Sequence, residues 1–123
     1  MQALRSKKMA NPQASKLHVV DVSQLMRLVE EVRAKTAKAL DELVENLESA
    51  SCTDVEQDFA GLVKASQQLL RVDDLELARA LNVSRPTIGR WTRGDSAPHR
   101  LARPAVFEVL IKKARAQVRE LRG

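Results

Sequence analysis

The chain of 123 residues is poor in aromatic residues, and glycine and proline are also scarce. Its aromatic residues are Phe59, Trp91 and Phe107, and it has no tyrosine. Strands favour aromatic and β-branched residues, whereas the alanine, leucine, arginine and glutamate that dominate here favour helices. We therefore predict an all-α fold, and the length suits one hydrophobic core rather than two.

Metal-ligating and nucleophilic patterns are also lacking. Cys52 is the single cysteine, so the chain cannot form an internal disulfide, and His18 and His99 are far apart. Structural zinc sites need four ligands at set spacings. The sequence also has no glycine-rich phosphate loop and no nucleophile motif of a hydrolase. We expect no metal, no cofactor and no enzymatic activity.

Long apolar runs are missing as well. No stretch has the roughly 20 uncharged apolar residues that a membrane helix requires. The first ten residues are partly basic but lack the apolar region of a secretory signal. We therefore expect a cytoplasmic protein with no membrane partner.

The net charge of +5 is distributed unevenly along the chain. Residues 1–20 carry four basic and no acidic side chains, whereas residues 21–58 carry ten acidic and four basic ones. Residues 85–103 carry five arginines against Asp95, and residues 104–123 carry five basic and two acidic side chains. Such asymmetry suggests that a polyanion binds the second half of the chain, although the basic residues could instead solvate a helix face.

The first half of the sequence predicts a disordered tail followed by one long helix. Residues 1–17 have no apolar period and are expected to form a disordered basic tail. Residues 18–50 predict a long amphipathic helix, with Asp21 as its N-cap. Its apolar side chains recur at alternating steps of four and three, which is a heptad pattern, at Leu25, Val29, Val32, Thr36, Ala39 and Leu43.

Two interpretations of this helix remain open. In the first it dimerises with a second copy through Leu25, Val29, Val32, Ala39 and Leu43. In the second it packs onto the rest of its own chain, which the weak core residues Thr36 and Ala39 leave possible.

Three further helices are indicated, two by capping boxes and one by an apolar stripe. Residues 49–53 suggest a break, and Thr53 with Glu56 forms a capping box that opens a helix over 54–70. Asp73 with Glu76 forms another, which opens a short helix ending near Asn82. A last helix with an apolar stripe is predicted after Pro104.

Residues 74–94 have the pattern of two short helices joined by a sharp turn. Asn82 tolerates a left-handed backbone at the turn, Ser84 can cap the second helix, and Gly94 follows its last turn. The side chains expected in the shared core are Leu77, Ala78, Leu81, Val83, Ile88 and Trp91.

This stretch resembles the helix-turn-helix of the phage repressor and Cro group, the XRE-like regulators, over about residues 70–103. The matching residues are Leu77-Ala78, Leu81, Asn82, Val83-Ser84, Thr87-Ile88 and Trp91. Asn82 stands where glycine is commoner, and Trp91 is bulkier than usual. The resemblance implies a helix-turn-helix head of about four helices over 54–123, preceded by the long amphipathic helix.

In the resembled family the second helix of the pair enters the major groove of DNA. Ile88 and Trp91 point inward, so the helical period places Pro86, Gly89, Arg90 and Arg93 outward, with Arg85 in the exposed first turn. We expect Arg85, Pro86, Gly89 and Arg90 to contact base edges. Gly89 would provide clearance for the DNA, although close approach to another helix is an equal alternative.

Phosphate contacts are expected from the flanks of this helix and from the following loop, at Ser84, Thr87, Arg93, His99, Arg100 and Arg103. The predicted function is a sequence-specific double-stranded DNA-binding transcriptional regulator, a repressor that binds a pseudo-palindromic operator as a homodimer. The alternative is a DNA-linked adaptor, such as an antitoxin or partition protein, whose acidic N-terminal helix binds a protein partner. Either protein would be associated with a bacterial or phage-type nucleoid.

Overall fold

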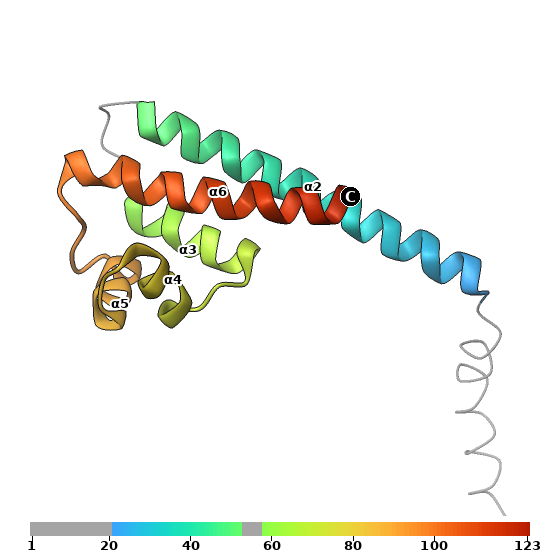
Figure 1. The fold of residues 1–123 in the computed structure, drawn as a ribbon, viewed down its shortest axis with the longest axis horizontal. Coiled ribbons are helices and arrows are strands. Elements are labelled where there is room, and N and C mark those ends of the chain that lie inside the picture. Colours follow the sequence, from blue (N-terminus) through green and yellow to red (C-terminus); the bar gives the residue numbers. More distant parts are fainter. Residues whose placement is uncertain (1–20, 53–57) are drawn as a thin grey trace, which may run out of the picture. The chain divides into compact units, whose positions relative to one another are not determined.

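The computed structural model describes residues 21–52 and 58–123, which form five α-helices and one 3₁₀ helix with no strand among them (Figure 1). The predicted all-α fold is thus confirmed for these residues. The predicted tail 1–17 and the box formed by Thr53 and Glu56 lie outside them. The elements in chain order are α2 (Val22–Cys52), α3 (Phe59–Leu70), α4 (Asp74–Leu81), α5 (Arg85–Arg93), η1 (Arg100–Ala102) and α6 (Arg103–Arg122).

The chain divides into two units, and the division falls inside α2, between Arg33 and Ala34. We describe each unit separately. The compact unit, Ala34–Gly123, begins earlier than the predicted head at residue 54, because the second half of α2 contributes to its core.

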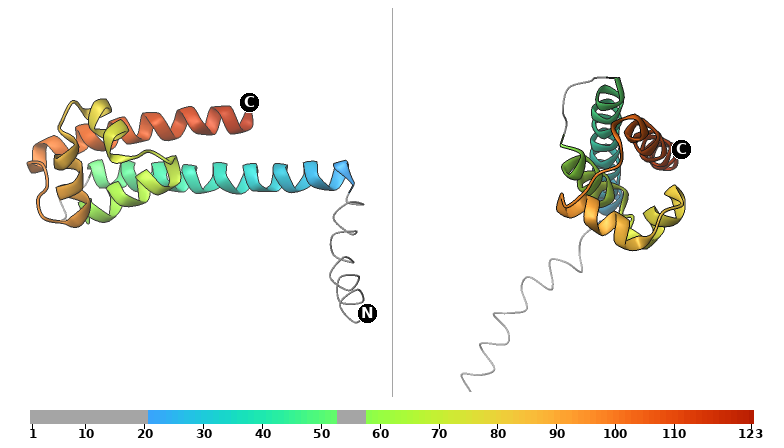
Figure 2. Two further views of the ribbon diagram at one scale, coloured as in Figure 1. Left: turned by 90° about the horizontal axis from the view of Figure 1, so that it is seen from below. Right: turned by 90° about the vertical axis from the view of Figure 1, so that its left-hand side faces the viewer.

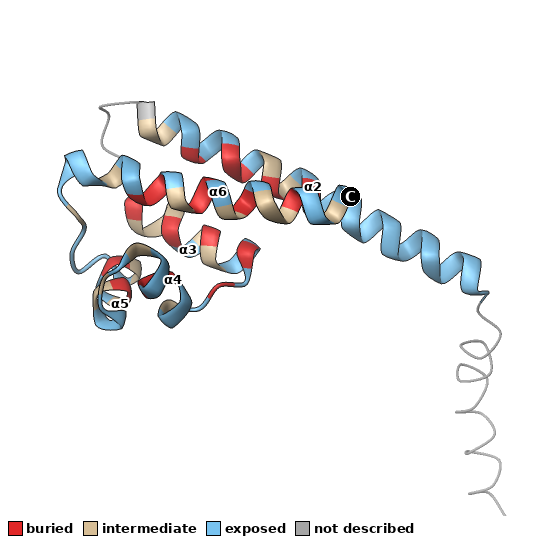
Figure 3. Ribbon diagram, viewed as in Figure 1, coloured by how far each residue is buried: buried red, intermediate tan, exposed pale blue. Residues whose placement is uncertain are grey.

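One hydrophobic core fills the compact unit, and all five of its α-helices supply buried side chains (Figure 3). The largest apolar side chains that are fully buried are Phe107, Leu40, Leu47, Leu77, Ile88, Leu110 and Val63. Burying a leucine or phenylalanine stabilises a fold by about 1.5–3 kcal/mol, so this cluster is the main source of stability.

The second half of α2 packs on its own chain. Its buried residues Ala37, Leu40, Val44 and Leu47 are spaced by three, four and three, one residue out of phase with the predicted dimer positions. Leu43 is also buried in this core and Ala39 is half-buried. The prediction that Leu43 contacts a second copy is therefore wrong: its side chain already lies in the intrachain core.

The C-terminal end of α2 and the start of α3 differ from the prediction. Helix α2 runs to Cys52, through most of the break predicted at residues 49–53, and the Ser51 hydroxyl donates to the Leu47 carbonyl oxygen at 3.0 Å within it. Helix α3 begins at Phe59 rather than at residue 54, because the Asp58 carboxylate accepts a hydrogen bond from the Gly61 amide at 2.9 Å and caps it.

Helices α2 and α6 run antiparallel where they face each other in the compact unit. Arg115 of α6 pairs with Glu48 of α2 at 2.8 Å, and Arg122 pairs with Asp41 at 2.7 Å. The residue number thus rises along α6 while it falls along α2, and Figure 2 shows the two helices side by side. Helix α6 starts at Arg103, two residues before the predicted start after Pro104, and Pro104 lies in its first turn.

Residues 22–33 of α2 carry a concentrated set of exposed apolar side chains. Leu25, Val29 and Val32 of the predicted dimer positions are exposed, together with Val22, Met26 and Leu28, each between 51% and 67%. Six of the nine large apolar side chains that are exposed in the described residues therefore lie within about three turns of one helix. Dimerisation through them stays a prediction.

Candidate nucleic-acid interface

Helices α4 and α5 are joined by a three-residue turn whose local chemistry follows from the sequence. The Asp73 carboxylate accepts a hydrogen bond from the Glu76 amide at 2.8 Å and caps α4. Asn82 ends α4 in the left-handed conformation at φ 58°, and the Val83 amide bonds the Ala78 carbonyl oxygen at 3.0 Å. The predicted cap and the predicted turn residue are both confirmed.

Helix α5 has the predicted start and stop. The Ser84 hydroxyl accepts a hydrogen bond from the Thr87 amide at 3.3 Å, and Pro86 lies in the first turn. Gly94 ends the helix at φ 79°. A β-carbon at Gly94 would touch nothing within 4 Å, so glycine is needed here for the backbone angle and not for space.

The inward face of the α4–α5 pair belongs to the core. Leu77, Ala78, Ile88 and Trp91 are buried, and Leu81 and Val83 pack against the same cluster. The Trp91 ring meets Phe59 of α3 edge to face, with ring centroids 5.5 Å apart. This packing fixes α5 on one side, and it makes the indole a core residue rather than a stacking platform for a base.

The outward face of α5 carries Arg85, Pro86 and Arg90, all of them exposed. The Arg90 Nη2 donates to Thr87 Oγ1 at 3.2 Å, which holds this guanidinium over the first turn of the helix. Among the described residues, Arg85 has neither an ion pair nor a side-chain hydrogen bond. Arg85 and Arg90 thus present two cations to solvent on the outward face of α5.

The hydroxyls of Ser84 and Thr87 lie 2.7 Å apart and share a hydrogen bond. Thr87 is half-buried, whereas Ser84 is exposed. Both predicted phosphate contacts therefore lie at the N-terminal end of α5. A helix N-terminus carries a partial positive charge that favours an anion, which suits a phosphate oxygen at this place.

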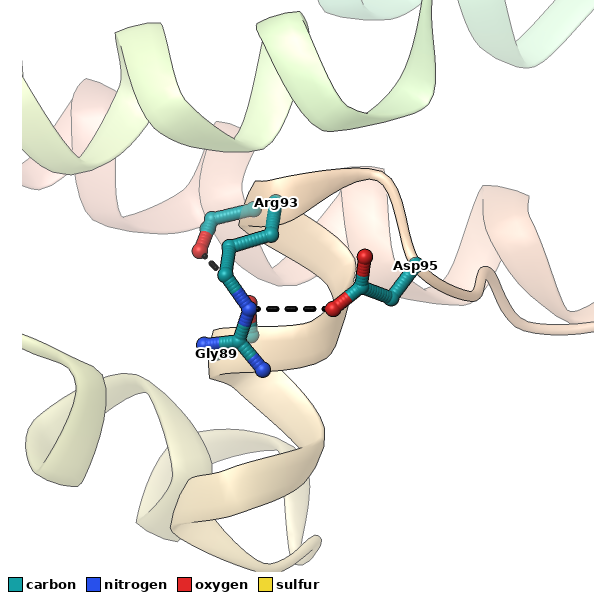
Figure 4. Close-up of polar contacts among 4 residues, drawn as sticks. Gly89, Arg93 and Asp95 are labelled. Atoms are coloured by element: carbon teal, nitrogen blue, oxygen red, sulfur yellow. Dashed lines mark hydrogen bonds and ion pairs between the residues drawn. The ribbon is translucent and has the colours of Figure 1, made fainter.

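Gly89 lies beneath the side chain of Arg93 (Figure 4). A β-carbon at Gly89 would be 3.1 Å from Arg93 Nη1, and its two other neighbours within 4 Å are also guanidinium atoms of Arg93. The alternative that Gly89 permits close approach of another helix is therefore wrong. The Arg93 Nε donates to Asp95 Oδ2 at 3.0 Å, so the guanidinium is held between Gly89 and Asp95.

The loop after α5 contains the remaining predicted phosphate contacts. His99 and Arg100 are exposed, and the His99 Nδ1 accepts a hydrogen bond from the Leu101 amide at 3.1 Å, which caps η1. Arg103 instead donates from Nε to the Pro98 carbonyl oxygen and lies over the Phe59 ring at 5.8 Å. This half-buried position favours a packing role for Arg103 over the predicted phosphate contact.

Two features of this surface were missed by the sequence analysis. Asp95 pairs with Arg93 across the left-handed Gly94, and only the spacing of two residues could have suggested it. Leu101 is 82% exposed next to Arg100, although its type suggests burial. Nothing in the sequence marks it, because η1 has no apolar period.

The basic residues of α6 form more ion pairs within the protein than those of α5 and its following loop. In α6, Lys113 pairs with Glu76 of α4 at 4.0 Å, and Arg115 and Arg122 pair with α2. In residues 85–103, the one arginine with an ion pair to another described residue is Arg93. The positive charge on α5 and its following loop is therefore less neutralised than the charge on α6.

Other kinds of site are not indicated within residues 21–52 and 58–123. No three histidine, cysteine, aspartate or glutamate side chains there are grouped so that they could hold a metal ion. None of the helices in the same ranges combines the length and the apolar character needed to cross a bilayer. Comparisons of the chain with protein-family models, with curated proteins and with solved structures found no match.

Proposed function

We propose that the protein is a sequence-specific double-stranded DNA-binding regulator that acts as a repressor, with α5 as the helix that enters the major groove. The observation that carries this proposal is the two-sided character of α5. Its inner side is anchored in the core by Ile88 and Trp91, while its outer side presents Arg85 and Arg90 to solvent.

The major groove is wide enough to admit one α-helix. Arginine is the side chain best suited to guanine, because its planar fork matches the O6 and N7 acceptors. We assign base contacts to Arg85 and Arg90, and Pro86 can touch a thymine methyl group from the same turn. The bonds from Thr87 to Arg90 and Ser84 reduce the number of conformations that the outer face must give up on binding.

Phosphate contacts position such a helix without specifying sequence. Ser84 and Thr87 at the N-terminal end of α5 and Arg100 in the following loop are exposed or half-exposed and suit this role. His99 adds a ring nitrogen, since its Nδ1 is used as the cap of η1 and its Nε2 has no partner among the described residues.

A second copy is the partner that we propose for the exposed apolar face at the start of α2. In the heptad pattern Val22 and Val29 occupy one core position, and Leu25 and Val32 occupy the other. In parallel coiled coils, β-branched residues at the first position with leucine at the second favour two strands, and Val32 departs from this pattern. Two heptads give only a weak dimer. Binding of two heads to neighbouring half-sites of one duplex would strengthen it, because the second head then binds at a raised effective concentration.

The experiment that tests the function is selection of bound duplexes from a random pool by the purified full chain. We expect enrichment of a sequence with two related half-sites about 10–10.5 base pairs apart, since this is the spacing of successive major grooves on one side of DNA. Replacement of Arg85 and Arg90 together by glutamine should abolish this enrichment while the thermal unfolding of the protein stays unchanged.

The matched control is Arg115→Gln together with Arg119→Gln, which removes two cations from α6. It should leave the enriched sequence unchanged. If the wild-type chain enriches no sequence, or if the α5 variant enriches the same sequence as the wild type, the proposal is wrong.

A further inference from the structure

We infer that Arg93 contacts a guanine rather than a phosphate, and that Asp95 and Gly89 hold its guanidinium for this contact. The inference rests on the proposed function and adds a specificity-determining residue, Arg93, and two positioning residues to it. It differs from the sequence analysis, which assigned Arg93 to the DNA backbone and Gly89 to clearance for the DNA.

The position of the guanidinium is the first step. Arg93 belongs to the last turn of α5, yet its Nη1 lies 3.1 Å from the place where a β-carbon of Gly89 would be. The side chain therefore lies back along the helix for one turn, over the middle of the outward face (Figure 4). A charged fork in this place faces the same direction as the groove-facing residues Pro86 and Arg90.

The second step is the orientation of the fork. Nε is the nitrogen that donates to Asp95 Oδ2, at 3.0 Å. Nη1 and Nη2 have no hydrogen-bond acceptor among the described residues, so the end of the fork remains available. Two parallel N–H donors in one plane suit the O6 and N7 acceptors of guanine. A side chain that is already held in one orientation loses less conformational freedom when it binds.

The third step concerns charge. A carboxylate close to DNA is repelled by the phosphates, and pairing with Asp95 lowers the attraction of Arg93 for any phosphate. If Arg93 served only as a phosphate contact, Asp95 would weaken it without benefit. A carboxylate that orients a fork instead exchanges general affinity for sequence preference, because the oriented guanidinium fits one base and not the others.

Gly89 completes the arrangement. With alanine at this position the β-carbon would lie 3.1 Å from Nη1, closer than nine in ten real contacts, so the guanidinium would have to shift by a few tenths of an ångström. Glycine inside a helix costs about 1 kcal/mol relative to alanine, which means that alanine should leave α5 at least as stable. The Gly89→Ala variant thus separates the position of the Arg93 fork from the stability of the helix.

The test uses the duplex that the wild-type chain selects and a set of duplexes in which each of its guanines is replaced in turn. We expect one G·C pair whose replacement lowers wild-type affinity roughly 5- to 150-fold, the equivalent of the 1–3 kcal/mol of a bidentate contact. Arg93→Lys should lose the preference at this pair and keep the preferences at all others.

Asp95→Asn and Gly89→Ala should each weaken the preference at the same pair. Asp95→Asn should also bind random duplex more tightly than the wild type, because a negative charge has been removed. The matched control is Arg119→Lys, which changes an exposed arginine of α6, outside the proposed DNA-binding surface, and should keep every preference. Thermal unfolding of each variant, followed by circular dichroism, monitors the fold.

The possible results separate the inference from the function. If Arg93→Lys lowers the affinity for all duplexes equally and keeps every preference, Arg93 is a phosphate contact and the inference is overturned, while the proposed function stands. An unchanged pattern of preferences in both Asp95→Asn and Gly89→Ala would overturn the positioning roles. If the wild type enriches no sequence, the proposed function is overturned and the inference with it.

Discussion

Arg71 and Asn82 are the two residues other than glycine with a positive φ among the described residues. Both end a helix in the left-handed conformation, at φ 57° and 58° respectively. Asn82 could be predicted, because asparagine tolerates this conformation better than other L-residues. Arg71 could not, since arginine has no such preference. It adopts the conformation because its neighbours Leu70 and Val72 are both buried in the core.

This difference leads to a prediction about stability. The left-handed conformation costs an ordinary L-residue about 1–2 kcal/mol, and glycine avoids this cost but loses more entropy on folding. We expect Arg71→Gly to raise the free energy of unfolding by up to about 1 kcal/mol. Asn82→Gly should raise it less. Thermal unfolding measures both changes, at about 4–8 °C per kcal/mol for a domain of this size.

The control for this prediction is Lys64→Gly in the middle of α3, where the residue is exposed and helical. This variant should lose about 1 kcal/mol because glycine is a poor helix former. If Arg71→Gly instead lost as much stability as the control, the prediction would be wrong. The contacts of the Arg71 side chain would then stabilise the fold by more than its left-handed backbone costs.

At the scale of the helices, the sequence predicted which segments are helical better than it predicted where each helix begins and ends. The caps at Asp73 and Ser84 and the stop at Gly94 are local hydrogen-bonding choices, so a few neighbouring residues determine them. The prediction missed the end of α2 and the start of α3: α2 continues through the predicted break to Cys52, and Asp58 caps α3. The apolar repeat of α2 misled because two faces one residue apart are nearly equally apolar, and only the core distinguishes them.

Helix α2 supports a prediction about self-association, which rests on the exposed apolar face at Val22, Leu25, Met26, Leu28 and Val29. We expect the wild-type chain to show a concentration-dependent dimer in sedimentation experiments. Leu25→Lys should shift this equilibrium toward monomer by at least tenfold, since it places a charge in the apolar face. Thermal unfolding should be unchanged, because residue 25 lies outside the compact unit.

Gln24→Lys adds the same charge on the polar side of this helix and should leave the dimer intact. If the wild type is monomeric at all concentrations and a different protein binds this face stoichiometrically, the adaptor hypothesis would replace the homodimer. Equal effects of Leu25→Lys and Gln24→Lys would also contradict the dimer.

For the whole molecule, the uneven charge was visible in the sequence, but its neutralisation was not. Asp41 and Glu48 of α2 pair with Arg122 and Arg115 of α6, so part of the charge of the basic last helix is balanced within the protein. These two pairs join residues 67 and 81 positions apart in the chain, which no local pattern could reveal. The basic character that remains is concentrated in α5 and its following loop.

This distribution predicts how salt should affect binding to the selected duplex. Each phosphate contact adds about 0.9 to the slope of log affinity against log salt concentration. We expect Arg100→Gln to reduce this slope by about 0.9 per head without altering sequence preference. The measurement is a titration of the duplex at several salt concentrations.

The control is Arg115→Gln, which removes another exposed arginine, one that is already paired with Glu48. We expect no change in its slope. A similar reduction in both variants would indicate that net charge acts at long range and that Arg100 makes no specific phosphate contact.

The edge-to-face contact between Trp91 and Phe59 has a practical consequence. Trp91 is the one tryptophan of the chain, and it lies on the buried side of α5, the helix that carries the exposed arginines Arg85, Arg90 and Arg93. All tryptophan fluorescence of the protein therefore originates from the buried side of α5. A change in this fluorescence at a lower temperature than the loss of helical circular dichroism would show that α5 detaches from the core before the rest of the protein unfolds.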